Sequence, residues 1–119
     1  MARTYRVGVI GFAHMHVNHL LDTFAALPNV EWVACADTVP AVAPLSDKPS
    51  TRRANLRRAI EVTGIPRAYD DWHELLERER CDIIVMCPEN ARHGEVAEAV
   101  AATGTHILTE KPMSATLAD

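Results

Sequence analysis

The sequence predicts an α/β fold with a doubly wound parallel sheet in a single domain. Short apolar runs alternate with segments whose apolar residues recur every three to four positions, as in strands that alternate with helices. The run 83–87 is apolar throughout, which is typical of a strand buried on both faces of a parallel sheet. A glycine follows the first apolar run directly and leads into the first helical pattern. A length of 119 residues suits one domain with one core.

The first half of the chain is expected to form two strands and two helices. Residues 5–10 read as a strand, and residues 15–27 as a helix with Val17 and Leu21 on its apolar face. Residues 30–36 read as a second strand. The stretch 38–50 carries three prolines and is expected to be a loop.

A second helix is expected over residues 51–63, ended by Gly64. Its Leu56, Ala59, Ile60 and Thr63 form an apolar stripe. The basic run on the other side of this helix is expected to be a solvated face: Arg52, Arg53, Arg57 and Arg58.

The second half continues the same alternation. A short strand is expected over residues 67–69, and a brief helix around Trp72 after a cap at Asp70 or Asp71. The buried strand 83–87 follows, then a helix over 91–103 and a last strand over 106–109. Ser114 could cap a further helix that has barely begun at Asp119, so we expect a chain cut before the last strand of the sheet.

Composition and charge exclude several classes of protein. A formal net charge of −4 argues against broad nucleic-acid binding, which needs a basic face. The N-terminus lacks the apolar core of a signal peptide, and no apolar run approaches the length of a membrane span. Three cysteines without a close pair favour a reducing compartment. We therefore expect a cytoplasmic protein, with neither nucleic acid nor membrane as a partner.

The stretch "GVIGFAHMHVNH" has the position of a dinucleotide-binding turn. In such a turn one glycine makes the bend, a second lets the backbone approach the pyrophosphate, and a third lets helix and strand pack closely. Gly11 meets the first need, and Ala13 is the smallest replacement at the second. His16 stands at the third position and is expected to add bulk between helix and strand. Taken alone, the turn is therefore only weak support for dinucleotide binding.

Asp37 strengthens this interpretation. An acidic residue at the end of the second strand can accept both ribose hydroxyls of NAD, and it repels the 2′-phosphate of NADP. No arginine follows Asp37 at once, so NAD is favoured over NADP, although Arg52 and Arg53 could fold back toward it. The competing interpretation is that Asp37 only caps the following turn.

Two further strand ends carry polar residues. In "MCPENARH", Pro88 halts the strand, Asn90 can donate and accept hydrogen bonds, and His93 either contributes to a site or packs on the turn. In "TEKPMS", Glu110 and Lys111 bring a carboxylate and an ammonium to the end of the last strand. Ligands of open α/β sheets bind beyond the carboxyl ends of the strands. A lysine there could bind a substrate hydroxyl or help to move its proton.

The sequence resembles the N-terminal half of the glucose–fructose oxidoreductase, inositol dehydrogenase and rhizopine-catabolism (Gfo/Idh/MocA) family. The resemblance rests on "RVGVIGFAHMH", "VEWVACAD" and "CDIIVMCPENARHGEVAEAVAATGTHILTEKPMSATLAD", and it covers nearly the whole chain. The Glu-Lys-Pro after "GTHILT" is quite specific to that family, whereas the glycine turn is its least faithful part.

The resemblance implies a Rossmann-type NAD(P)-binding domain over residues 1–119. The full-length protein would be a CH–OH oxidoreductase that moves hydride between NAD and a sugar-like or polyol substrate, with NADP less favoured and a homo-oligomer possible. The family's C-terminal substrate domain is absent from this chain, so the chain alone is expected to be inactive. The resemblance assigns cofactor contacts to Gly11, Phe12, Ala13, His14, Asp37, Pro88, Asn90 and Glu110, and the catalytic role to Lys111.

Two other classes of function remain open at this point. One is a non-catalytic nucleotide-binding or assembly module, which the substituted turn favours and the retained Glu-Lys-Pro disfavours. The other is a fragment of a metal-dependent hydrolase in which His14 and His16 act as ligands. Zinc needs three or four ligands in a tetrahedral array. Of the remaining histidines only His93 could plausibly join those two, so we expect no metal site.

Overall fold

Five parallel strands form one sheet in the computed structural model, which describes residues 3–40 and 51–118. The strands are β1 (Tyr5–Ile10), β2 (Val30–Ala36), β3 (Ala68–Tyr69), β4 (Ile83–Met86) and β5 (His106–Thr109). Their spatial order is β3-β2-β1-β4-β5. The chain therefore builds outward from β1 in one direction and then returns to build from β1 in the other. This confirms the doubly wound parallel sheet, whose switch point lies between β1 and β4.

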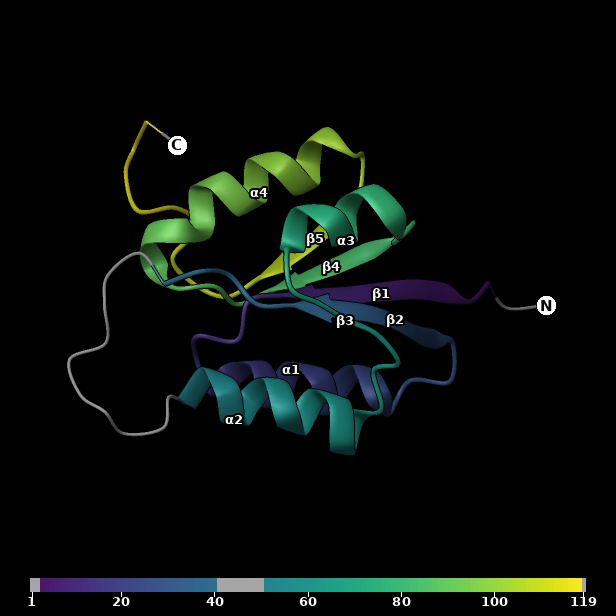
Figure 1. The fold of residues 1–119 in the computed structure, drawn as a ribbon. Helices are drawn as coiled ribbons and strands as arrows, with labels where there is room; N and C mark the ends of the chain where they lie inside the picture. The colour runs from purple at the N-terminus through teal and green to yellow at the C-terminus, as the bar shows by residue number, and fades with distance from the viewer. Residues whose placement is uncertain (1–2, 41–50, 119) are drawn as a thin grey trace.

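Helices cover both faces of the sheet (Figure 1). On one face lie α1 (His16–Ala25), α2 (Thr51–Arg58) and the π-helical turn η1 (Ala59–Thr63). On the other face lie α3 (Trp72–Arg78) and α4 (His93–Ala102), the latter preceded by the 3₁₀ turn η2 (Asn90–Arg92). Gly64 ends η1 with a φ of +82°, and the Asp71 carboxylate accepts the N–H of His73 at the start of α3. The predicted stop and cap are thus confirmed.

The sheet separates two apolar cores, because successive side chains of a strand point to opposite faces. In β4 and the residue after it, Val85 and Cys87 join the core under α1 and η1, whereas Ile84 and Met86 join the core under α3 and α4. Val17 and Leu21 of α1 are fully buried in the first core, as their spacing predicts. The continuous apolar run is therefore a strand buried on both faces.

Two sequence expectations about the second helix are wrong. The Arg52 side chain is only 15% exposed and not part of a solvated face, because it pairs with carboxylates from other elements. Ile60 is 41% exposed instead of buried. The π-helical geometry of η1 changes the helical period there, which turns Ile60 away from the core that Ala59 enters.

The chain after β5 also differs from expectation. The structure has no helix at Ser114, where the chain bends and the Ser114 hydroxyl donates to the Thr116 carbonyl at 2.6 Å. A first helical turn is costly to nucleate when no apolar face packs it, and Leu117 is fully exposed. In the predicted loop 38–50, residues 41–50 lie outside the described part of the chain.

A polar network ties the amino ends of β1 and β4 together. The Asp82 carboxylate accepts the backbone N–H of Arg6 at 2.8 Å. The nearly buried Glu79 carboxylate lies 2.8 Å from the Arg67 guanidinium and 3.4 Å from that of Arg6, and it accepts the Tyr69 hydroxyl at 2.9 Å. Arg6 and Asp82 lie at the amino ends of β1 and β4, opposite the ends that carry the predicted site. Their contact therefore holds these two strands together away from the predicted site.

Within the residues described, none of the helices has both the length and the apolar character that crossing a membrane requires.

Candidate cofactor site

The register of the sheet brings the predicted site residues to one edge. Ile10 pairs with Ala36 on one side and with Met86 on the other, and Met86 in turn pairs with Thr109. The residues that follow these strands, Gly11, Asp37, Cys87 and Glu110, therefore emerge side by side. The chemistry expected at four separate strand ends thus meets at the switch point of the sheet.

Gly11 allows two backbones to touch. Its φ is +94°, and a Cβ placed on it would lie 2.3 Å from the Pro88 nitrogen and 2.6 Å from the Cys87 carbonyl carbon. Any other residue there would place its Cβ against the turn after β4, and its backbone would have to adopt an unfavourable positive φ. The glycine is therefore required both for the bend and for close approach, although the close approach is to the neighbouring strand end.

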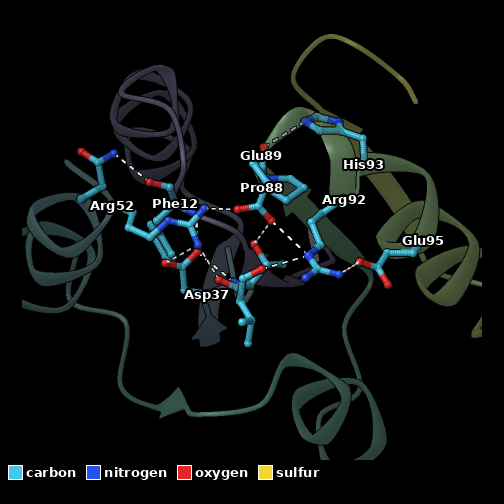
Figure 2. Close-up of polar contacts among 11 residues, drawn as sticks. Phe12, Asp37, Arg52, Pro88, Glu89, Arg92, His93 and Glu95 are labelled. Atoms are coloured by element: carbon cyan, nitrogen blue, oxygen red, sulfur yellow. Dashed lines mark hydrogen bonds and ion pairs between the residues drawn. The ribbon is translucent and has the colours of Figure 1, made fainter. Parts of the chain in front are cut away.

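Asp37 holds the turn from the side of β2. Its Oδ1 accepts the N–H of Phe12 at 3.0 Å and of Thr38 at 2.9 Å, and its Oδ2 lies 3.5 Å from Nη1 of Arg52 (Figure 2). Burial raises the pKa of Asp37, while the Arg52 charge and the two N–H donors act in the opposite direction. The capping interpretation of Asp37 is therefore confirmed in part, since Oδ1 serves the turns on both sides. Oδ2 is the oxygen left to face a ligand or the guanidinium.

The backbone of the turn offers two free donors. Gly11 N–H donates to Ala36, Phe12 N–H to Asp37, and Ala13 N–H to Cys87. Among the described residues, the N–H groups of His14 and Met15 have no acceptor. These two groups lie just before the first turn of α1, where an anion is favoured by the helix dipole. Phe12 itself is fully buried, so only its backbone faces the turn.

The prediction that His16 adds bulk between helix and strand is wrong. Its side chain is 49% exposed and points toward Glu110, with 3.0 Å between Nδ1 and Oε1. The residue that packs against the sheet is Val17, which is fully buried. The turn is longer than the glycine pattern assumes, since α1 begins only at His16, and the histidine therefore faces the crevice.

Two adjoining cavities lie over this edge and share His14, Pro88 and Asn90 in their walls. The larger, about 460 Å³, is completed by His16, Cys87, His93, Glu110, Lys111 and Pro112. The other, about 420 Å³, is completed by Ala13, Pro40, Glu89 and Ala91. Five of the predicted residues, His14, Pro88, Asn90, Glu110 and Lys111, thus line one cavity. Ala13 lines the other, on the side of the β2 end.

The Glu-Lys-Pro segment begins where β5 ends. The Glu110 carboxylate accepts its neighbour's N–H, that of Lys111, at 3.0 Å. This hydrogen bond, followed by the contact with His16, lowers the pKa of Glu110. The Lys111 side chain is exposed, and the Lys111–Pro112 peptide bond is cis. The segment therefore presents a fixed carboxylate and an accessible ammonium to the larger cavity.

His93 is a buried link between two strand ends. Its Nε2 lies 3.1 Å from the Pro88 carbonyl oxygen, and its Nδ1 lies 3.2 Å from the Thr109 hydroxyl. Burial lowers the pKa of His93, so the neutral ring is favoured. A neutral ring can donate from Nε2 to the carbonyl, and its Nδ1 then lies beside a threonine hydroxyl that itself donates to the Glu110 carbonyl at 2.8 Å. His93 therefore joins the Pro88 turn to the segment that carries Glu110.

Sequence reasoning missed Asn55 and Glu89, whereas the alternative it left open for Arg52, that this residue folds back toward Asp37, is confirmed. Asn55 of α2 is buried, donates to the Phe12 carbonyl at 3.0 Å and accepts from Asn18 at 3.1 Å. Arg52 reaches from the same helix to the Glu89 carboxylate, which also accepts the Thr38 hydroxyl at 3.2 Å. Of these residues, only Asn55 could have been suspected from the sequence, because it is a polar residue one position before the apolar stripe of its helix.

The histidines do not form the metal cluster that a hydrolase would need. In the part of the chain that the structure describes, no three His, Cys, Asp or Glu side chains converge as metal ligands would. Instead, the His14 ring accepts the backbone N–H of His16 at 3.1 Å.

Comparison with known proteins agrees with this geometry. Residues 5–119 match the family described as an oxidoreductase family with an NAD-binding Rossmann fold, Gfo/Idh/MocA. Myo-inositol 2-dehydrogenase of Thermotoga maritima is 30% identical over 114 residues, which cover 96% of this chain and 30% of that protein.

Two solved structures are similar as well. The crystal structure of a probable dehydrogenase from Thermotoga maritima superposes with a TM-score of 0.70 at 29% identity, covering 95% of this chain and 30% of that one. KijD10, a 3-ketoreductase from Actinomadura kijaniata in complex with NADP and TDP-benzene, gives a TM-score of 0.69 at 28% identity, with coverages of 94% and 30%. The chain thus spans about 30% of the length of these relatives. It belongs to the Gfo/Idh/MocA oxidoreductase family and is its NAD-binding Rossmann domain.

Proposed function

We propose that this domain binds NAD across the two adjoining cavities and, in a longer protein, serves a hydride transfer to or from a sugar-like or polyol carbon. The observation that carries the proposal is the meeting of Gly11, Asp37 and Glu110-Lys111 at one edge of the sheet. The residues fit the cofactor. The turn leaves two N–H donors free for a pyrophosphate, and Asp37 keeps one carboxylate oxygen for the adenosine ribose.

The larger cavity suits the nicotinamide end. Pro88 and Asn90 would line the nicotinamide, with the Asn90 amide able to donate and accept hydrogen bonds. Nicotinamide supplies the hydride chemistry when it is bound. Lys111 would hold the substrate hydroxyl or move its proton, as the catalytic residue of the longer protein. The relatives named above, an inositol dehydrogenase and a 3-ketoreductase, support a polyol or sugar-like substrate.

Binding of NADH to the purified protein tests the cofactor assignment. Asp37→Ala is expected to weaken NADH binding by roughly tenfold to a hundredfold, because it removes a charged acceptor of ribose hydroxyls. Asp37→Asn keeps an acceptor for the turn and removes the charge, which separates ribose binding from turn geometry. Asp22→Ala is the matched control, since Asp22 is exposed on α1 and pairs with Arg58. Unchanged affinity in both Asp37 variants would refute the ribose assignment.

The role of Lys111 is tested in the longer protein with its substrate. Lys111→Ala is expected to lower kcat by roughly a hundredfold or more, while the Kd for NADH changes by less than about threefold. An unaffected kcat would remove Lys111 from the reaction.

We also propose a reducing, cytoplasmic setting, which is supported by three free thiols. Burial raises the pKa of Cys35 to about 12 and that of Cys81 to about 11, so both thiols stay protonated.

A further inference from the structure

The Arg52 guanidinium spans the site between two carboxylates. It comes from the first turn of α2, lies 3.5 Å from Asp37 of the β2 end, and pairs closely with Glu89 of the β4 end (Figure 2). It also donates to the Thr38 carbonyl. All three contacts come from other elements, and the side chain is only 15% exposed. The arginine is thus held in one place.

Glu89 holds Arg52 from the β4 end. One Glu89 oxygen takes Arg52, and the other accepts the Thr38 hydroxyl at 3.2 Å and lies 3.4 Å from the Arg92 guanidinium. Arg92 in turn donates to the Val39 carbonyl at 2.9 Å and pairs with Glu95. Both Glu89 oxygens therefore have partners, and these contacts hold its negative charge near Asp37.

This arrangement bears on which nicotinamide cofactor fits. On the proposed function, Asp37 faces the adenosine ribose, at the hydroxyl to which NADP adds a phosphate. A phosphate brings close to two negative charges, and a forked arginine is its preferred partner. Arg52 is near enough to Asp37 to serve such a phosphate. Both of its terminal nitrogens are already engaged, however, and two carboxylates would face the phosphate there.

We propose that Glu89 is a specificity-determining residue that makes the site selective for NAD by keeping Arg52 engaged. This inference rests on the proposed function, because it assumes that the ribose lies at Asp37. Without the Glu89 charge, Arg52 would turn to a 2′-phosphate, and one repulsive carboxylate would be gone. The site would then accept NADPH.

The test compares NADH and NADPH binding to the wild-type protein and to Glu89→Gln, by the change in nicotinamide fluorescence. The wild-type protein is expected to bind NADH more tightly than NADPH. Glu89→Gln is expected to tighten NADPH binding by roughly tenfold or more, as for one new charge-assisted hydrogen bond, and so to shift the ratio of NADPH to NADH affinity toward NADPH. A gain of affinity is informative, since general damage to the turn would weaken both cofactors together.

Two further variants separate the causes. Glu89→Gln combined with Arg52→Ala is expected to lose the gain in NADPH affinity, because the phosphate then lacks its partner. Glu98→Gln, an exposed carboxylate on α4, is the matched control and should change neither affinity. Glu89→Ala replaces Glu89→Gln if the latter does not fold, as judged by circular dichroism.

The outcomes are distinguishable. If the wild-type protein binds neither cofactor, the proposed function fails. If it binds NADH and Glu89→Gln leaves NADPH affinity unchanged, the role of Glu89 is refuted while the proposed function stands. If the gain survives in the double variant, Arg52 is not the phosphate partner, and the inference about Glu89 and Arg52 is overturned.

Discussion

Replacing Gly11 with alanine should be among the most destabilising single-atom additions in this domain. The substitution places a Cβ 2.3 Å from the Pro88 nitrogen and 2.6 Å from both the Cys87 carbonyl carbon and the Pro88 Cα. All three atoms belong to backbone, so no side-chain rotation can relieve the contact. The turn after β4 must move away from the turn after β1.

The cost has two parts that can be worked separately. An alanine at the observed φ of +94° costs about 1–2 kcal/mol from backbone conformation alone. Displacing the packed Cys87–Pro88 backbone adds about 1–3 kcal/mol, as overpacking does in a tight interior. The total of about 2–5 kcal/mol is a large fraction of the 5–15 kcal/mol that stabilises a typical domain.

Gly64→Ala is the control that isolates the contact. Gly64 also has a positive φ, +82°, yet a Cβ there meets nothing within 4 Å. Urea unfolding should therefore show a loss of only about 1–2 kcal/mol for Gly64→Ala and a further loss of about 1–3 kcal/mol for Gly11→Ala. Equal losses in the two variants would refute the close-approach argument and leave only the backbone conformation to explain Gly11.

Two other predictions concern the titration of His93 and the network of Glu79. Because the folded-state pKa of His93 is lowered, its contribution to stability is fully present above its unfolded pKa of about 6.5 and is lost as pH falls through the lower folded value. The difference in unfolding free energy between the wild-type protein and His93→Gln should therefore shrink from pH 7.5 to pH 5; a difference that stays constant would contradict this. Glu79→Gln should cost about 1–3 kcal/mol in urea unfolding, because the nearly buried charge that pairs with Arg67 and Arg6 is lost and an amide N–H₂ group replaces one oxygen, whereas Glu77→Gln on the exposed side of α3 should change little. NADH affinity should be unaffected by Glu79→Gln, and a loss of binding without a loss of stability would show that the network reaches the cofactor site.

The sheet could be predicted from the sequence because its signal is local. The apolar run 83–87 is compatible with a buried strand or a buried helix segment. Its short length, and the alternation of strands and helices around it, favoured a strand. The importance of Gly11 and Asp37 could also be predicted from the sequence. The need for them arises from backbone geometry immediately after a strand, and each can be recognised without knowing its neighbours.

The residues that could not be predicted are those whose partners lie far along the chain. Arg52 reads as a solvated charge in its own helix, and although the sequence leaves open a return toward Asp37, nothing in it indicates the pairing with Glu89. Asn55 is buried because it satisfies the Phe12 carbonyl, which lies on another element. His16 was misplaced for a different reason, since the glycine pattern assumes a shorter turn than the one that precedes α1. Helical periodicity likewise gave no warning of the π-helical turn that exposes Ile60.

The polar network at the amino ends of the strands has a practical consequence. Asp82, Glu79 and Arg6 join β1 and β4 at one edge of the sheet, while the residues proposed to bind the cofactor follow the same two strands at the other edge. If Glu89 sets cofactor preference as proposed, changes at Glu89 and stabilising changes around Asp82 should add, because the groups share no partner. We therefore expect that stability and cofactor choice can be altered independently in this domain.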